Sequence, residues 1–376
     1  MRNEISCTSS IISIIVDSSL LNSSGGDWSA LYEFSKNQCV EAIVWENISH
    51  LVKIKDSPKQ SAPLVLKLKW ALAAEQIETR YAHQKAVIGK LAKFFSEHGI
   101  KMLILKGYGL SLNYPTPKHR PCGDVDIWLF QEHVGMDGAV QRVVAQQRAD
   151  KLLQEHFCVQ IDNDKHHHTV FYIDGVMVEN HYDFLNIHSH RSNKIIEHRL
   201  LELVLQPLEA VDVDGATVYL PSADFHALFL LRHSTSHFAA ERITLRHLLD
   251  WRYFVERYSR DMDWTGLQEF ARKMNMHRFL NAMNAICIDY LGLPAECVPA
   301  FDRDVALEKR VWNEILHPEF PEQRPKGVGY LKSWRFMFRR WWANRWKHCI
   351  VYREGLLSTF WIQLWSHMLK PKSLKL

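Results

Sequence analysis

The spacing of hydrophobic residues predicts helices over roughly residues 1–95. Apolar residues cluster at 64–70 and recur at helical intervals at 87–95. Gly99 is a typical helix end, and the apolar run at 100–105 has the length of a short buried strand. The chain therefore changes from helical to mixed structure at about this point.

Strand-like and helix-like patterns then alternate to about residue 220. A short helix is expected over 107–113, a strand over 120–129 and a long helix over 132–156. From Pro221 the spacing is helical almost to the end, with Ser222 as an N-cap. The expected fold class is α+β. A small mixed-sheet core, residues 96–220, is flanked by an N-terminal helical region, 1–95, a helical domain, 221–325, and a helical tail, 326–376.

A hairpin is the clearest local prediction within the core. Residues 169–173 and 176–182 are rich in β-forming residues and are joined by Asp174-Gly175, which suits a two-residue type I′ turn. Such a turn fixes the register of the two strands. It therefore also predicts which side chains lie opposite each other.

Two aspartates on the expected strand are the first candidates for chemistry. Asp124 and Asp126 are two residues apart, so they share one face while Val125 and Ile127 point into a core. Two like charges held this close need a cation, and Mg²⁺ prefers oxygen ligands and commonly bridges to phosphate. The pattern indicates a metal and phosphate site, and a strand end with two solvated acids is the alternative.

Glu179 lies mid-strand among apolar residues of the hairpin. An unpaired carboxylate there is costly to bury unless it meets a cation, which is a reason to bring it to the two aspartates. In the predicted register His168 lies opposite His181 on the same face, so both could flank the acids. The alternatives are an acid on the solvated face of an edge hairpin and two partly exposed histidines.

Lys106-Gly107 is the expected other side of this site. It connects the strand at 100–105 to a helix, whose first N–H groups and dipole favour an anion, while Lys106 adds positive charge. Arg120, just before the aspartates, is a further candidate phosphate contact. A surface arginine is an equal alternative.

Composition is that of an ordinary globular protein. The chain has 376 residues, 47% of them hydrophobic and 23% charged, and a formal net charge of +4. Its seven cysteines are scattered and lack any Cys-x-x-Cys pair, which argues against disulfides and structural zinc. The apolar run 11–16 lacks the flanks of a secretion signal, so we expect a cytoplasmic protein.

The last 51 residues have a different charge balance. Residues 326–376 hold 11 Lys and Arg, one acid, Glu354, and six of the 13 tryptophans. Such a helical tail suits an anionic surface, either lipid headgroups or nucleic acid. A basic cap packed on its own domain is the alternative that we favour slightly.

Taken together, the motifs resemble a known family. The order Leu-Lys-Gly, Arg-Pro-x-Gly-Asp-Val-Asp and Val-x-Val-Glu-x-His resembles the polymerase-β-type nucleotidyltransferase superfamily, and more narrowly a bacterial group of uncharacterised nucleotidyltransferases. Residues 228–233, His237 and Leu-Leu-Asp at 248–250 are similar to a helical segment of that group. The resemblance covers about residues 30–260. Lys106-Gly107 replaces the superfamily's usual Gly-Ser or Gly-Gly, as it does in the narrower group.

The resemblance implies transfer of a nucleoside monophosphate from a nucleoside triphosphate such as ATP to a hydroxyl acceptor, with release of pyrophosphate. Asp124 and Asp126 would bind the Mg²⁺ or Mn²⁺ that holds the triphosphate, and Glu179 would join them at a second ion or act as general base. The residues that would contact the nucleotide or its phosphates are Lys106, Gly107, Arg120, His181, His233 and His237.

Three histidines of the predicted helical domain share one helix face. His226, His233 and His237 could bind zinc, but we favour a position of His233 and His237 in the cleft between core and helical domain. Arg246 and Asp250, four residues apart, are expected to form a structural pair.

Two other classes of protein remain open. Metal-dependent glycosyltransferases also use Asp-x-Asp, although they need alternating strands and helices before it, and a non-catalytic interaction module is the third possibility. The acceptor could be a small molecule, a protein or an RNA end.

Overall fold

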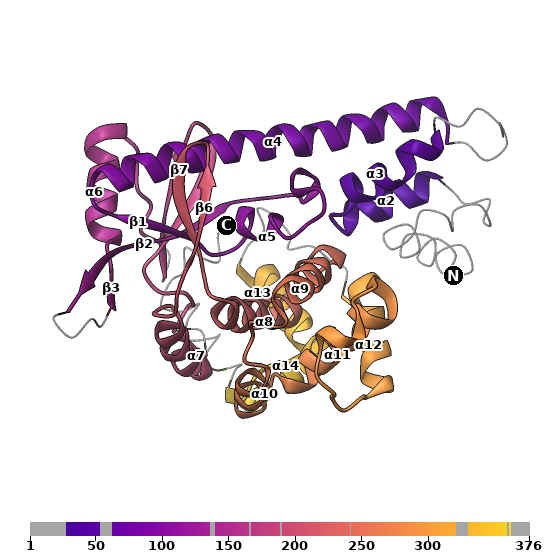
Figure 1. The fold of residues 1–376 in the computed structure, drawn as a ribbon. Coiled ribbons are helices and arrows are strands. Elements are labelled where there is room, and N and C mark those ends of the chain that lie inside the picture. The colour runs from indigo at the N-terminus through magenta and orange to yellow at the C-terminus, as the bar shows by residue number, and fades with distance from the viewer. Residues whose placement is uncertain are drawn as a thin grey trace.

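The computed structural model describes residues 28–52, 62–135, 140–164, 167–188, 190–240, 242–320, 330–358 and 361. The apolar run at 11–16 lies outside these residues. Helices α2 (Trp28–Asn37) and α3 (Glu41–Val52) pack beside one end of α4 (Leu64–Glu97), which extends across the molecule to the sheet (Figure 1). Trp70 of α4 is buried there, and its indole N–H donates to the carbonyl oxygen of Glu41 at 2.7 Å.

One mixed sheet of seven strands forms the core of the described chain. The order is β4-β5-β2-β1-β7-β6, with β3 also paired to β2. Two pairs, β2 with β5 and β1 with β7, are parallel, and the others are antiparallel. The strands are β1 (Lys101–Ile104), β2 (Val125–Val134), β3 (Val140–Val144), β4 (His168–Ile173), β5 (Val176–His181), β6 (Glu209–Val213) and β7 (Ala216–Leu220).

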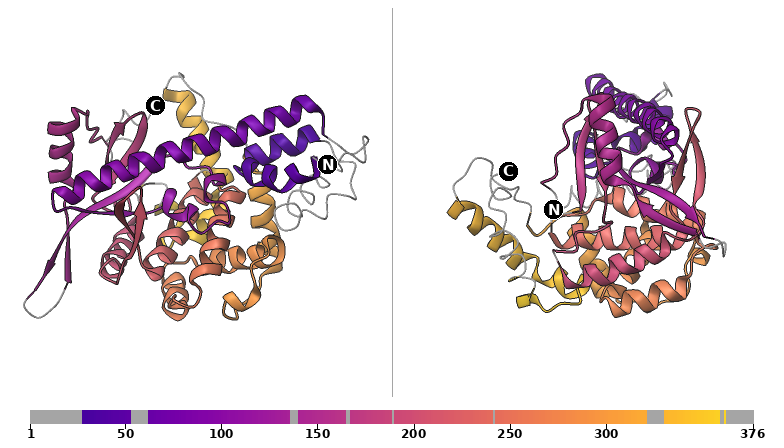
Figure 2. Two further views of the ribbon diagram at one scale, coloured as in Figure 1. Left: turned by 45° about the horizontal axis from the view of Figure 1, so that its top comes forward. Right: turned by 90° about the vertical axis from the view of Figure 1, so that its left-hand side faces the viewer.

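The two faces of this sheet are covered by different helices. Helices α4 and α6 (Gln146–Phe157) lie on one face, where Ile127 and Leu129 of β2 join a hydrophobic core (Figure 2). Trp128 and Phe130 of the same strand belong to the second core, which extends into the helical domain. Because residues alternate along a strand, Asp126 shares the face of Trp128 and looks toward the helical domain.

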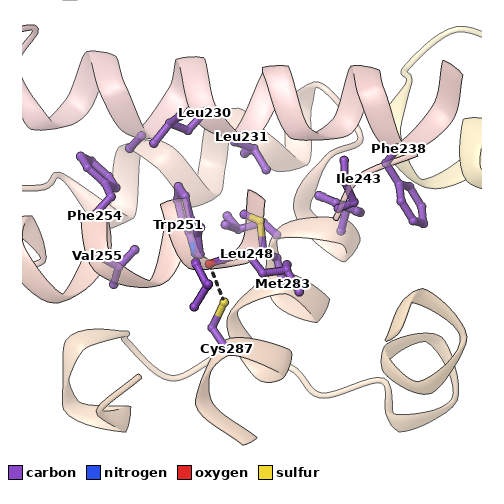
Figure 3. Close-up of a cluster of buried hydrophobic side chains, with 14 of the residues drawn as sticks. Leu230, Leu231, Phe238, Ile243, Leu248, Trp251, Phe254, Val255, Met283 and Cys287 are labelled. Carbon is purple, nitrogen blue, oxygen red and sulfur yellow. Dashed lines mark hydrogen bonds between the residues drawn. The ribbon is translucent and has the colours of Figure 1, made fainter. Parts of the chain in front are cut away.

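The helical domain is built around a second cluster of apolar side chains. It contains α8 (Ala223–Ala240), α9 (Leu245–Tyr258), α10 (Trp264–Lys273), α11 (His277–Leu291) and α12 (Val305–Leu316), while α7 (Arg191–Leu203) precedes it and α13 (Tyr330–Ala343) and α14 (Arg345–Val351) belong to the tail. Figure 3 shows Leu231, Leu248 and Met283 meeting around Trp251. The Trp251 indole N–H donates to Asn284 Oδ1 at 2.8 Å, which satisfies its buried polar group. This packing joins α8, α9 and α11 to one another.

Much of the sequence-based prediction agrees with the structure. The expected α+β class is confirmed, α4 ends before Gly99, and short helix α5 (Tyr108–Ser111) follows β1. A 3-10 turn at Pro117–His119 lies between α5 and β2. Ser222 accepts a hydrogen bond from the Phe225 N–H at 3.3 Å, as an N-cap should.

One predicted element is wrong in its first half. The long helix expected over 132–156 is a helix only from Gln146, because 132–134 extend β2 and 140–144 form β3. The β-branched valines of this stretch, with Gly135 and Gly138 between them, favour a strand pair. The hairpin of β6 and β7 was not predicted, although Asp214-Gly215 repeats the turn signal of Asp174-Gly175.

The tail contains helices, as expected. Lys347 of α14 is buried and pairs with Glu314 of α12 at 2.5 Å, which anchors this end of the chain to the helical domain. Phe338 and Trp342 of α13 remain largely exposed. Within the described residues, no helix combines the length and the apolar character needed to cross a membrane.

Candidate active site

The two carboxylates at the centre of the site come from neighbouring parallel strands. The register of β2 and β5 places Asp126 directly beside Glu179. Asp124 precedes β2 by one residue and lies on the same face as Asp126. The structure therefore brings together the three acids that the sequence singled out.

Asp126 is the most enclosed of the three, with 1% of its side chain exposed. Its Oδ1 accepts from Lys106 Nζ at 3.0 Å and lies 3.3 Å from His181 Nε2. Burial opposes its ionisation, but Lys106 and His181 outweigh burial and hold the pKa of this carboxyl well below its usual range. Its Oδ2 is buried and has no hydrogen-bond partner among the described residues.

Asp124 is half-buried and differs in its electrostatics. Burial raises the pKa of its carboxyl, and the neighbouring charge of Asp126 raises it further, while Lys106 acts in the opposite direction. A cation between the two aspartates would relieve this repulsion.

Glu179 lies between two histidines. Its Oε1 is 3.4 Å from His168 Nε2, and its Oε2 is 3.7 Å from His181 Nε2. The predicted cross-strand pair of His168 with His181 is confirmed, and Val170 lies opposite Glu179. Burial lowers the pKa of His181, but its contacts with Asp126 and Glu179 prevail and raise it to about 9.

Lys106-Gly107 lies against the aspartates, but not as the start of a substantial helix. Gly107 has φ of +60°, and a Cβ there would meet the Asp124 carbonyl oxygen at 3.3 Å. Glycine thus allows the close approach of the two loops. Because α5 has only four residues, the helix dipole expected from the sequence is not available, and the positive charge comes from Lys106.

Arg120 lines the cleft, but its guanidinium group is already paired. Its Nε and Nη2 donate to the two carboxylate oxygens of Asp250 at 2.7 and 2.8 Å, and Tyr114 Oη donates to the same carboxylate at 2.6 Å. The expected pair of Arg246 with Asp250 is wrong, because Arg246 instead donates to the carbonyl oxygen of Pro121 at 3.3 Å. Asp250 therefore pairs with Arg120 from the loop before β2 and not with Arg246, its neighbour four residues earlier on the helix. A phosphate contact of Arg120 stays a prediction.

Helices α8 and α9 form the opposite wall of the cleft. His233 and His247 line it across from Lys106 and the aspartates, around about 570 Å³ of free space that includes open solvent. Burial and the nearby Lys106 charge hold the pKa of His233 well below its usual range, so the imidazole is neutral.

The helical histidines do not form the zinc site that their spacing allowed. His226 is buried and its Nε2 donates to the Leu105 carbonyl oxygen at 2.9 Å, which ties α8 to the sheet. His237 lies behind His233, with ring centroids 4.4 Å apart, and is not among the residues that line the cleft.

Two histidines near the site were not predicted. His167 packs against His168 with ring centroids 4.3 Å apart, and His247 lies 6.2 Å from His233. The run His166-His167-His168 was the available signal for the first, since it directly precedes the strand that faces Glu179. Nothing in the local sequence marks His247, which the α8–α9 packing brings to the cleft.

Comparison with known proteins gives one extensive match. The family described as uncharacterised nucleotidyltransferase matches residues 24–292, more than two thirds of the chain. No curated protein matches. A crystal structure of an antigenic nucleotidyltransferase-like protein from Paracoccidioides brasiliensis is 18% identical, covering 46% of this chain and 74% of that one, with a TM-score of 0.31. That score is too low to support an argument about the site.

Proposed function

Because the chain belongs to the uncharacterised nucleotidyltransferase family, we propose that it transfers a nucleoside monophosphate from a nucleoside triphosphate to a hydroxyl acceptor. The observation that carries the proposal is the pairing of β2 with β5, which sets Asp126 beside Glu179 with Asp124 one step away. Asp124 and Asp126 line a cleft beside Lys106, and Glu179 lies next to Asp126 in the sheet. One or two such carboxylates, together with substrate phosphates, are the donors that commonly bind Mg²⁺.

The residues present fit such a metal ion. Asp126 Oδ2 is buried without a hydrogen-bond partner in the described chain. Burial and the negative charge of Asp126 both raise the pKa of Asp124, so a cation between the two carboxylates would be favourable. Oxygen ligands from Asp124, Asp126 and Glu179 would hold Mg²⁺ or Mn²⁺. When bound, the ion would neutralise phosphate charge and lower the pKa of the acceptor hydroxyl.

Side chains of the protein would contact the phosphates, accept the acceptor's proton and orient the carboxylates. Lys106 is 21% exposed toward the cleft and would place its charge against the phosphates. Glu179 would accept the acceptor's proton, while the neutral His233 on the opposite wall would contact the nucleotide. His181, bound to Asp126 and Glu179, would orient both carboxylates rather than reach the nucleotide itself.

The proposed reaction balances without an outside oxidant or reductant. The acceptor oxygen forms a bond to the α-phosphorus as the bond from that phosphorus to the bridging oxygen breaks. Pyrophosphate leaves with the electron pair, and the acceptor's proton passes to Glu179 and then to solvent. The acceptor, whether a small molecule, a protein or an RNA end, gains one nucleoside monophosphate.

The proposal can be tested with α-labelled nucleoside triphosphates. Purified protein, Mg²⁺ and cell extract should give labelled acceptor, and Asp126→Asn should reduce the transfer by roughly 10²–10³-fold, the loss typical of a group that stabilises transition-state charge. Glu132→Gln is the matched control, since Glu132 lies on the same strand but pairs with Lys101 and Arg142 at the far end. Glu132→Gln should melt near the wild-type temperature, and circular dichroism checks that Asp126→Asn, which loses the carboxylate facing Lys106, is folded.

Three results would argue against the proposal. Transfer that is unchanged in Asp126→Asn would place the activity elsewhere. Transfer only from labelled sugar nucleotides would indicate a glycosyltransferase, and a folded protein that labels nothing with any of the four triphosphates would indicate a non-catalytic module. A mass increase of one nucleoside monophosphate on a recovered molecule would identify the acceptor.

A further inference from the structure

Three histidines gather beside Glu179 on the hairpin side of the site. His168 starts β4, His181 ends β5, and His167 directly precedes β4. One ring nitrogen from each of the three lies within 4.8 Å of the others. The ring centroids of His168 and His181 are 5.0 Å apart, and those of His167 and His181 are 5.5 Å apart.

Glu179 completes this group with a carboxylate. Its two oxygens lie 3.4 Å from His168 Nε2 and 3.7 Å from His181 Nε2. In a tetrahedral site with bonds of about 2.0–2.2 Å, neighbouring ligand atoms are roughly 3.3–3.6 Å apart. The contacts of Glu179 with His168 and His181 are close to this spacing, and the ring nitrogens of the three histidines lie within 4.8 Å of one another.

The surroundings match a metal site as well as the spacing does. His168 and His181 are buried, and Nδ1 of His167 is buried without a hydrogen-bond partner in the described part of the chain. The antiparallel pairing of β4 with β5 fixes His168 opposite His181, so two of the ligands are held by backbone hydrogen bonds. Ligands carried on paired strands are held more precisely than ligands on loops.

We propose that His167, His168, His181 and Glu179 bind a divalent transition metal of the zinc class. Imidazole nitrogen binds Zn²⁺ in preference to Mg²⁺, whereas the carboxylate oxygens of Asp124 and Asp126 suit Mg²⁺. Asp126 lies beside Lys106, and His168 lies on the hairpin beside Glu179. His181 lies between the two groups, because its Nε2 is 3.3 Å from Asp126 Oδ1 and 3.7 Å from Glu179 Oε2. Two different ions would therefore be held on either side of one glutamate, and the assignment of the second does not depend on nucleotidyl transfer.

The proposal is tested by metal binding to the full chain. Stripped protein is titrated with Zn²⁺ in a calorimeter, in the presence of millimolar Mg²⁺, and with Co²⁺ while visible absorption is recorded. We expect one Zn²⁺ per chain and the strong absorption bands of four-coordinate Co²⁺. Separate His167→Gln, His168→Gln and His181→Gln variants should each weaken Zn²⁺ binding by at least the ~10–100-fold seen when only a supporting residue is lost.

Matched controls separate this site from other histidines and from the aspartates. His198→Gln changes an exposed histidine, and His233→Gln changes the cleft histidine near His237, so both should leave Zn²⁺ affinity unchanged. Asp124→Asn should remove Mg²⁺-dependent transfer but keep Zn²⁺ binding. If transfer fails in every preparation while Zn²⁺ binds as expected, only the proposed function is contradicted.

Two outcomes would overturn the proposal. One is the absence of stoichiometric Zn²⁺ or Co²⁺ binding by folded wild-type protein. The other is affinity that stays within threefold of wild type in those of the three variants that keep the wild-type circular dichroism spectrum. Three separate substitutions are used so that the misfolding of one leaves the others informative.

Discussion

The buried pair of Arg120 and Asp250 joins the loop before β2 to α9, and its removal should destabilise the protein strongly. Only 6% and 8% of the two side chains are exposed, and the carboxylate accepts three hydrogen bonds, two from Arg120 and one from Tyr114. Asp250→Ala leaves a buried guanidinium without its partner. Breaking such a pair costs about 3–5 kcal/mol.

Urea denaturation followed by circular dichroism measures this loss. If the free energy of unfolding falls by ~3 kcal/mol per molar urea, the urea concentration at the unfolding midpoint should decrease by roughly 1–1.7 M. The double variant Arg120→Met with Asp250→Leu should recover at least ~2 kcal/mol relative to the sum of the single changes, because apolar replacements remove both charges together. The recovered part is the coupling between the two residues.

Arg246→Met is the control that tests the alternative pairing. Arg246 and Asp250 have the spacing of a helical ion pair, but the side chain of Arg246 instead makes a weak hydrogen bond to the carbonyl oxygen of Pro121. This substitution should therefore cost less than ~1 kcal/mol. The reasoning is refuted if Arg246→Met is the more damaging change, or if Asp250→Ala costs less than ~1 kcal/mol.

Two further predictions concern pH and the Lys106-Gly107 loop. Burial raises the pKa of Glu197 from 4.5 to about 7, against the lowering effect of hydrogen bonds from the Phe184 and Leu185 N–H groups. The native state then binds more protons than the unfolded state between these values, so unfolding free energy should fall by about 3 kcal/mol from pH 4.5 to 7. Glu197→Gln should flatten this profile in urea titrations across the range, and an equal slope in both proteins would contradict the assignment. Gly107→Ala should lower stability by roughly 1 kcal/mol or more because of its positive φ, measured by thermal melting. Gly123→Ala, where an added Cβ meets nothing within 4 Å, should melt as wild type, and equal melting of both variants would be the contrary result.

The hairpin shows how far local sequence can predict this site. Asp174-Gly175 sets a two-residue turn, and that turn alone determines that His168 faces His181. The parallel pairing of Asp126 with Glu179 is different, because it depends on how two separate segments enter the sheet. Chemistry suggested that the acids meet, but no pattern in the chain specified the strand register.

Two predictions are wrong, the pair of Arg246 with Asp250 and the helix over 132–144, and their physical origins differ. Arg120 and Asp250 are 130 residues apart, so their contact arises from packing of the core against the helical domain. Sequence spacing indicates Arg246 instead, because residues four apart on a helix are neighbours whatever the tertiary packing. The helix expected over 132–144 is a different case, because Glu132 and Val134 pair with Arg142 and Val140 in a local hairpin that the valines and glycines of the stretch favour.

The separation of the site's parts along the chain has a consequence for how the protein is made. Asp126 leaves the ribosome 55 residues before His181, which corresponds to roughly 3–10 s of synthesis. Lys106 has already emerged by then, and the antiparallel contact of β1 with β2 needs no later residue. The nascent chain can thus pair Asp126 with Lys106 before His181, the other partner of this carboxylate, has been synthesised.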